Sequence, residues 1–223
     1  MRKLKTLVGR AAALPIENLD TDQIMPKQFL HGIDKSGLDR GLLYDLRYDA
    51  QGNARPDFVL NRPERAGTRI LIGGANFGCG SSREHAVWGL QQYGIEAVVA
   101  PSFGEIFYSN AMNNQLLLVM LPPADIAALT ADAERPETAE VHIDLEQLRL
   151  RSASVDAAFA MSARHRRMLM EGLDVIGLSM THAEQIEAFA HRHWQQQPWV
   201  RDVASTTVAR LAELADPASR SPR

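Results

Sequence analysis

Three short apolar runs, each closed by a glycine or a proline, most strongly constrain what this chain can fold into. They cover residues 68–72, 95–100 and 116–121, and segments with helical character, 84–93 and 102–112, lie between them. Short runs rich in Ile, Leu and Val are typical of strands buried on both faces of a sheet. Strands that alternate with helices at this spacing predict βαβ units with parallel pairing. The chain is therefore expected to be an α/β protein with a mostly parallel central sheet.

The pattern on either side of these units adds further elements. Residues 6–14 predict a first strand, and alternating apolar positions in 141–150 predict a hairpin of edge strands. Further helices are expected over residues 124–135, 156–170, 182–195 and 203–214. Ser102 and Thr181 each precede a Glu at capping-box spacing, so both are expected to cap helices. The apolar stripe expected on the helix after Ser102 consists of Phe103, Ile106, Phe107 and Ala111.

Residues 1–195 are expected to form a single domain. Segment 31–67 is interrupted by glycines and prolines, which predicts a long excursion with one short helix that is mobile or contacts a partner. Residues 196–223 are rich in Gln, Pro, Ser and Arg and predict a partly disordered C-terminal extension.

Composition excludes several classes of protein. A formal net charge of −3 gives no electrostatic reason to expect a nucleic-acid partner. No apolar stretch approaches the roughly 20 residues of a membrane span. The apolar part of residues 6–13 is short and interrupted by Gly9 and Arg10, which argues against a signal peptide. Cys79 is the single cysteine, so no intramolecular disulfide can form, and a cytoplasmic location is expected.

The chemistry is expected at residues 73–89, GGANFGCGSSREHAVWG, between a strand and a helix. Glycines let the backbone turn sharply and approach a ligand closely. The start of a helix presents unpaired N–H groups that suit an anion. Ser81, Ser82 and Arg83 stand at this start, and a guanidinium can bind a carboxylate through two hydrogen bonds. The alternative is that the serines only cap the helix.

Other polar residues near this turn also allow two interpretations. Cys79 could be a nucleophile with His85 nearby, but a small residue packed in a tight turn is the commoner outcome. Glu84 and His85 could be ordinary helix-surface residues. The polar segment 17–26 could hold a ligand or simply form an Asx-turn and a helix cap. One cysteine and no histidine pair at ligand spacing predict no metal site in this chain.

Several ordered blocks of the sequence resemble the small subunit of 3-isopropylmalate dehydratase (isopropylmalate isomerase). That family is a free-standing version of the swivelling domain of the aconitase superfamily. The resemblance extends over residues 5–195, and its blocks are 18–30 (NLDTDQIMPKQFL), 56–61 (PDFVLN), 76–86 (NFGCGSSREHA), 100–107 (APSFGEIF), 113–117 (NNQLL) and 172–177 (GLDVIG). It implies a layered β/β/α swivelling-type fold.

The resemblance also implies a reaction and a partner. The reaction dehydrates and rehydrates a small dicarboxylate, interconverting 2-isopropylmalate and 3-isopropylmalate in leucine biosynthesis. In the family the Lewis acid is a 4Fe-4S cluster held by a large subunit, and one cysteine here cannot hold such a cluster. The chain is therefore expected to form a heterodimer with an iron–sulfur large subunit and to be active only with it.

Site roles follow from the same resemblance. Ser81 is expected to be the catalytic base, acting as an alkoxide, and Asp22 a second catalytic residue that orients the serine loop. Substrate-binding roles are expected for Ser82, Arg83 and Thr21. The site loop is expected to include Gly78, Cys79, Gly80 and His85.

Departures from the family pattern affect the substrate more than the reaction. Ser162 replaces an expected Asp, Arg164 replaces an aromatic residue, and segment 31–48 is only loosely similar. An isopropyl pocket could be lined by Phe29, Leu30, Ile33, Leu42 and Leu43, or these could belong to the core. Citraconate/2-methylmalate and homoaconitate are alternative substrates. A non-catalytic binding module is a third hypothesis, although it predicts loss of site residues that are present.

Overall fold

The computed structural model describes residues 3–30 and 35–215, with side chains through Glu213. Its strands are β1 (Thr6–Leu14), β2 (Ile70–Gly73), β3 (Ala97–Ala100), β4 (Leu117–Met120), β5 (Glu140–Asp144), β6 (Arg149–Arg151) and β7 (Asp156–Ala158). Its helices are α1 (Thr21–Ile24), α2 (Tyr44–Arg47), α3 (Glu84–Tyr93), α4 (Glu105–Asn113), α5 (Pro123–Glu134), α6 (Ala163–Glu171), α7 (Val175–Met180), α8 (Ala183–Gln196) and α9 (Val203–Ala215). Single 3₁₀ turns lie at Lys27–Phe29, Leu38–Arg40, Val59–Asn61, Pro63–Arg65 and Pro198–Val200.

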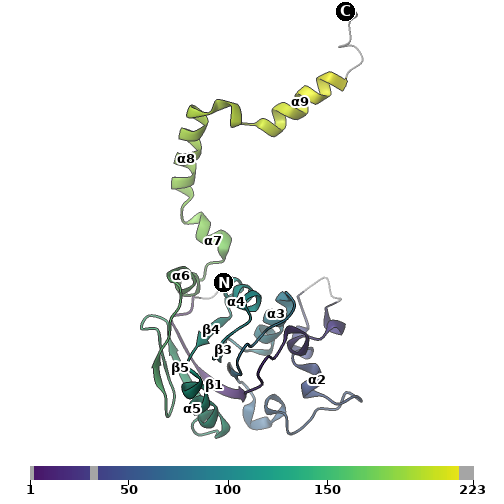
Figure 1. Cartoon of the computed structure of the whole chain (residues 1–223), viewed down its shortest axis with the longest axis vertical. Coiled ribbons are helices and arrows are strands. Elements are labelled where there is room, and N and C mark those ends of the chain that lie inside the picture. The colour runs from purple at the N-terminus through teal and green to yellow at the C-terminus, as the bar shows by residue number, and fades with distance from the viewer. Residues whose placement is uncertain (1–2, 31–34, 216–223) are drawn as a thin grey trace, which may run out of the picture. The chain divides into compact units, whose positions relative to one another are not determined.

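A seven-stranded sheet with the order β4-β3-β2-β1-β5-β6-β7 forms the centre of the fold (Figure 1). Strands β1 to β4 pair in parallel, with Ala12 opposite Leu71 where β1 meets β2. The pairings of β1 with β5, β5 with β6 and β6 with β7 are antiparallel. The α/β class and the βαβ units are therefore confirmed, and the parallel strands form one half of a mixed sheet.

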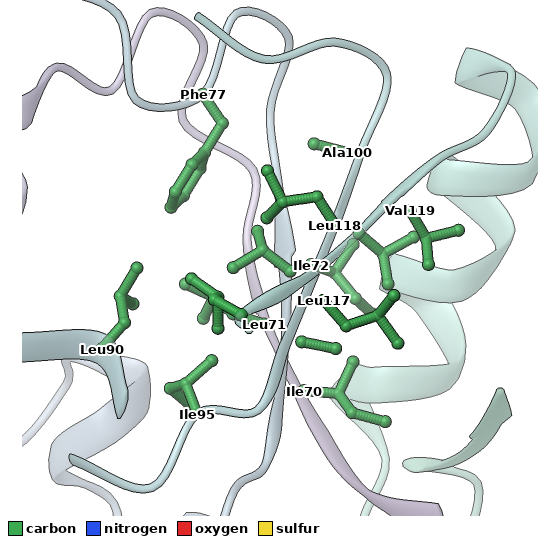
Figure 2. Packing of buried hydrophobic residues seen from close by; sticks show 14 of the residues in the cluster. Ile70, Leu71, Ile72, Phe77, Leu90, Ile95, Ala100, Leu117, Leu118 and Val119 are labelled. Carbon is green, nitrogen blue, oxygen red and sulfur yellow. The ribbon is translucent and has the colours of Figure 1, made fainter. Parts of the chain in front are cut away.

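The core explains why the parallel strands are continuous apolar runs. Strands β2 and β3 are buried along their whole length. Side chains of β2 and β4 gather with those of α3 in the close-up of the core (Figure 2). A strand covered on both faces buries every side chain, so its sequence shows no polar alternation.

Most expected elements are confirmed within a residue or two, and the errors have local causes. The expected hairpin is present as β5 and β6, but neither is an edge strand, because β5 lies between β1 and β6, and β6 lies between β5 and β7. Residues 156–158 form strand β7, where a helix was expected to begin, because an antiparallel partner, β6, is available. Residues 175–180 form helix α7, which was not among the expected helices. Neither expected capping box exists, since α4 begins after Gly104 and α8 after His182 without a side-chain cap. Ile106 was expected to face the core as part of the apolar stripe, but it is 49% exposed.

The described part of the excursion, residues 35–67, is more ordered than one short helix. It contains α2 and three 3₁₀ turns, and Leu38, Leu42, Leu43 and Leu60 are buried. The guanidinium of Arg47 is buried in this segment, where Nε donates to Asn61 Oδ1 over 3.2 Å. The expectation that the segment is mobile or contacts a partner stays a prediction.

Asp132 in α5 anchors the loop between β6 and β7. Its carboxylate is buried, and Oδ2 accepts hydrogen bonds from Ser152 Oγ over 2.6 Å, from Ser154 N over 2.9 Å and from Ser154 Oγ over 2.8 Å. Burial alone raises the pKa of a carboxyl group, but these hydrogen bonds together hold the pKa of Asp132 below its usual value. The charged form of Asp132 therefore ties the antiparallel half of the sheet to α5.

The chain divides into two compact units, Met1–Val175 and Ile176–Arg223. The division falls before the boundary expected at residue 195, which stays a prediction. In the second unit α8, the 3₁₀ turn at Pro198–Val200 and α9 expose large apolar side chains, among them Phe189, Trp199 and Val208. Among the described helices, none is both long and apolar enough to cross a bilayer.

Candidate functional site

The loop after β2, residues 74–83, is held between two other loops at the carboxyl ends of the parallel strands. It accepts and donates backbone hydrogen bonds along the segment after β1: Asn18 N donates to Ala75 O over 2.8 Å, and Gly78 N donates to Leu19 O over 2.7 Å. On its other side, Gly104 N donates to Phe77 O over 2.9 Å. Ligands of open α/β sheets bind at this edge, so the topology itself brings the two polar segments of the sequence together.

Two glycines fix the path of the loop. Gly78 has a φ of +75°, and a Cβ there would lie inside van der Waals contact of the Phe107 ring. Gly80 has a φ of +92°, a conformation that side chains rarely adopt. These glycines let the loop lie flat against α4 and then turn outward, which leaves Ser81 and Ser82 exposed.

Thr21 fixes the position of Ser81 through a hydrogen bond to the Ser81 backbone. Thr21 is 1% exposed, and its Oγ1 donates to the Ser81 carbonyl over 2.8 Å. Its backbone N also donates to Cys79 O over 2.9 Å. The Thr21 hydroxyl is therefore used within the chain, as a support for the serine loop, and the substrate-binding role expected for Thr21 stays a prediction.

Asp22 and Arg83 form an ion pair across the two segments. Arg83 Nη1 lies 2.5 Å from Asp22 Oδ1, and it also donates to Met25 O over 3.4 Å. The Arg83 side chain is 11% exposed and that of Asp22 is 44% exposed. Within the described residues, Arg83 Nε and Nη2 make no hydrogen bond, so they remain available for a carboxylate. Asp22 thus orients the guanidinium, while the sequence predicted that it would orient the loop.

The polar segment 17–26 forms a helix cap, which was one of its two interpretations. Asp20 caps α1, and its side chain accepts from Gln23 N while the Gln23 side chain accepts from Asp20 N. The residues that follow this cap, Thr21 and Asp22, are the ones that contact the serine loop. The cap therefore sets the orientation of the site residues.

Cys79 and His85 do not form a pair. Cys79 Sγ donates to Asn18 O over 3.4 Å. The ring of His85 packs on Trp88, with 4.9 Å between ring centroids. The neighbouring Glu84 is exposed but accepts from Asn114 Nδ2 over 2.8 Å. These contacts favour packing and surface roles over a cysteine nucleophile.

The candidate isopropyl pocket is not assembled within the described residues. Leu42 and Leu43 are fully buried in the core, while Phe29 and Leu30 are half-buried against it. Ile33 lies outside the described residues. Packing in the core therefore accounts for the apolar side chains of Leu42, Leu43, Phe29 and Leu30.

Two asparagines outside the predicted site residues, Asn18 and Asn76, link the segment after β1 to the serine loop. Asn18 and Asn76 both have positive φ, 54° and 57°, and Asn76 Nδ2 donates to Asn18 Oδ1 over 2.8 Å. Ser102 Oγ accepts from Asn76 N over 2.8 Å, which is why Ser102 does not cap α4. Asparagine adopts positive φ more readily than most residues, and that preference is the signal that could have identified them.

The residues of this chain do not fit an iron–sulfur cluster. Such clusters are held by several cysteine thiolates, and Cys79 is the single cysteine of the sequence. Among the described residues, no group of three His, Cys, Asp or Glu side chains is placed to hold a metal ion.

Comparisons with known proteins match two parts of the chain to families. Residues 1–124 match the model of the aconitase C-terminal domain, and residues 176–203 match the model of the C-terminal domain of the 3-isopropylmalate dehydratase small subunit. A curated relative from Chromobacterium violaceum, "3-isopropylmalate dehydratase small subunit 1", is 63% identical over 92% of this chain and 96% of its own length. A relative from a Ruegeria species, "3-isopropylmalate dehydratase small subunit", is 44% identical over 90% of this chain and 100% of its own length.

A solved structure is similar as well. The crystal structure of 3-isopropylmalate dehydratase from Methanocaldococcus jannaschii has a TM-score of 0.61 and 27% sequence identity. The similarity covers 82% of this chain and 99% of the other.

Proposed function

The chain belongs to the family of 3-isopropylmalate dehydratase small subunits, and we propose that it supplies a serine base and a carboxylate clamp to a site completed by a large subunit. It is the small subunit of a hydro-lyase of leucine biosynthesis. The proposed reaction interconverts 2-isopropylmalate and 3-isopropylmalate by dehydration and rehydration.

The observation that carries the site assignment is the arrangement of Ser81 and Ser82 beside Arg83. Both serines are exposed, while the adjacent guanidinium is held by Asp22 through one of its nitrogens. An arginine fixed in this way keeps one edge for a bidentate contact with a carboxylate. Ser82 would add a hydroxyl to the same carboxylate.

Ser81 would remove the proton on the carbon next to the bound carboxylate. A serine hydroxyl is a very poor base in water, so its alkoxide needs donors and a site from which water is excluded. N–H groups of the turn and the nearby Arg83 are the donors within this chain. Because Ser81 is exposed in the isolated chain, the wall that excludes water must come from another protein.

We propose that this wall is the large subunit, and that the large subunit also carries a 4Fe-4S cluster as the Lewis acid for the substrate hydroxyl. The cysteine content of this chain supports the cluster being held elsewhere. A cytoplasmic location is part of the same proposal, since a reducing compartment would suit both the lone thiol and an iron–sulfur cluster.

The test combines this chain with its cognate large subunit. After anaerobic cluster reconstitution, absorbance of the unsaturated intermediate is followed with 2-isopropylmalate, 3-isopropylmalate and citraconate. Turnover of the isopropylmalates is expected, and turnover of citraconate alone would overturn the substrate assignment.

Two further measurements test the division of roles. The Ser81→Ala chain should assemble with the large subunit but lose activity, with Ser109→Ala, an exposed serine of α4, as the matched control. Full activity of Ser81→Ala would exclude Ser81 as the base. The isolated wild-type chain should be colourless and inactive, and a brown single subunit would contradict the assignment of the cluster to the partner.

A further inference from the structure

A polar cluster outside the predicted site residues ties together the loops that follow β1, β2 and β3. Its centre is Asn76, near the start of the serine loop (residues 74–83). Asn76 Nδ2 donates to Asn18 Oδ1 over 2.8 Å, and Asn76 N donates to Ser102 Oγ over 2.8 Å. Asn18 follows β1, and Ser102 follows β3. Asn76 therefore connects the serine loop to the loops on both of its sides.

Asn18 contacts the serine loop at three points. Its N donates to Ala75 O over 2.8 Å, its Oδ1 accepts from Asn76, and its O accepts from Cys79 Sγ over 3.4 Å. Cys79 is two residues before Ser81, so these contacts extend from the start of the loop almost to the serine. A displacement of Asn18 would therefore be transmitted to the backbone that carries Ser81.

The composition of the serine loop explains why it needs such ties. Glycines stand at positions 73, 74, 78 and 80, and Ser81 itself is exposed. Glycine loses more conformational freedom on ordering than any other residue. A glycine-rich loop with an exposed end keeps a single shape only where neighbouring segments hold it.

The use of asparagine at positions 18 and 76 points to the side-chain amides as the reason. Both residues have positive φ, 54° and 57°, which glycine would adopt without cost. Gly78 and Gly80 show that the same loop uses glycine where only the backbone conformation matters. Asparagine tolerates this conformation and adds the hydrogen bond between Asn76 and Asn18.

We propose that Asn18 and Asn76 are positioning residues, whose amide pair sets the location of Ser81. The proposal rests on the proposed role of Ser81 as the base. A reacting group has to be held within about 0.5 Å of its productive position. Both asparagines are exposed, so water competes for their hydrogen bond and its loss has a small effect on overall stability. The larger effect falls on the rate.

The test measures kcat and KM of the reconstituted two-subunit enzyme. Asn18→Gly and Asn76→Gly keep a residue suited to positive φ and remove the amide, alone and together. Asn18→Asp keeps an acceptor for Asn76 Nδ2 and serves as the rescue. Asn53→Gly is the matched control, because Asn53 is an exposed asparagine outside the serine loop whose Nδ2 donates to Asp49 Oδ2 over 3.1 Å.

Asn18→Gly and Asn76→Gly should each lower kcat about 10-fold and change KM less than about 2-fold. The double variant should lose no more than either single variant, because both changes remove the same hydrogen bond. Asn18→Asp and Asn53→Gly should keep kcat within about 2-fold of wild type. In a Ser81→Ala background, Asn76→Gly should not lower the residual rate further.

Hydrogen–deuterium exchange of the isolated chain gives a second measurement that does not depend on activity. The amides of Phe77 and Gly78 donate to Ser102 O and Leu19 O, so they report whether the loop is held. Their exchange should be about 5-fold faster in Asn18→Gly and Asn76→Gly than in wild type or Asn53→Gly, as for the loss of one neutral hydrogen bond.

Wild-type kcat in both glycine variants, a raised KM with unchanged kcat, an equal loss in Asn53→Gly, or unchanged exchange at Phe77 and Gly78 would each overturn the proposal. Absence of turnover by the wild-type enzyme would instead refute the proposed function. The exchange rates would then decide by themselves whether the asparagine pair holds the serine loop.

Discussion

The hydrogen bond from Thr21 to the serine loop gives the sharpest test of how this site is positioned. Thr21→Val keeps the shape of the side chain and removes only the hydroxyl that donates to the Ser81 carbonyl over 2.8 Å. Thr21 is 1% exposed, so valine can occupy the same space among its neighbours. The change therefore acts on the position of Ser81 without touching its hydroxyl.

The expected effects on stability and on activity differ in size. A neutral hydrogen bond contributes about 1 kcal/mol to the free energy of unfolding, which lowers Tm by roughly 2–4 °C for a chain of this length. A misplacement of about 1 Å at a reacting group can reduce the rate roughly 100-fold. We therefore expect kcat to fall by about 10- to 100-fold, far more than the loss in stability would cause.

The assay uses the reconstituted two-subunit enzyme and compares kcat and KM for wild type, Thr21→Val and Thr21→Ser. Serine keeps the hydroxyl and should retain most of the activity. KM should change little, because the Arg83 clamp is intact. In a Ser81→Ala background, Thr21→Val should still lower Tm but should have no further effect on the residual rate, because Thr21 acts through Ser81.

Two results would refute the reasoning. If Thr21→Val lowered Tm but kept the wild-type kcat, the hydrogen bond would have a structural role only. If Thr21→Val raised KM with kcat unchanged, Thr21 would bind substrate, which is the role that the family resemblance implies.

Three further changes test other parts of the structure. Gly78→Ala forces a Cβ against Phe107 at a φ of +75° and should lower the free energy of unfolding, measured in urea, by about 2–4 kcal/mol. The control Gly37→Ala has the same φ but open space around the new Cβ, so it should lose less. Arg83→Lys loses the bidentate fork and should lower kcat/KM by about 100-fold, and an unchanged value would show that the clamp lies elsewhere. Asp132→Asn should cost about 2–3 kcal/mol at pH 7. The pKa of Asp132 is lower in the folded chain than in the unfolded chain. Its contribution to the free energy of unfolding is therefore fully present above the unfolded pKa and is lost as pH falls through the folded pKa. The stabilities of wild type and Asp132→Asn should accordingly converge in acid.

The sequence predicted the parallel half of the fold well because those elements are determined by local pattern. The strand at Thr6–Leu14 and the helix at Glu84–Tyr93 have the bounds expected from periodicity. Strand β7 was missed because its three residues have no pattern of their own and become a strand only by pairing with β6. The caps at Ser102 and Thr181 were wrong because tertiary contacts and local geometry override a capping pattern, as when Ser102 accepts from Asn76.

The sequence predicts which residues belong to the candidate site, but it does not predict which of their atoms contact one another. Ser81, Ser82 and Arg83 lie together at the start of α3, and that follows from their adjacency in the sequence. The ion pair of Arg83 with Asp22 joins residues that are far apart in the chain, and no local pattern encodes which atom of Asp22 faces which nitrogen. The exposure of Ser81 is likewise a property of the folded surface.

Three arginines of this chain show how burial and pairing together separate structure from binding. Arg47 has hydrogen bonds to Asn61 and to two carbonyls and needs nothing more. Arg83 is nearly as buried but uses a single nitrogen for Asp22 and Met25, which leaves one edge for a ligand beside the exposed serines. Arg65 is more buried than either Arg47 or Arg83, and its Nε and Nη1 make no hydrogen bond within the described residues. A guanidinium keeps its charge in all three environments, so the unpaired nitrogens of Arg83 beside the exposed serines, and not its exposed area, support its proposed role as the carboxylate clamp.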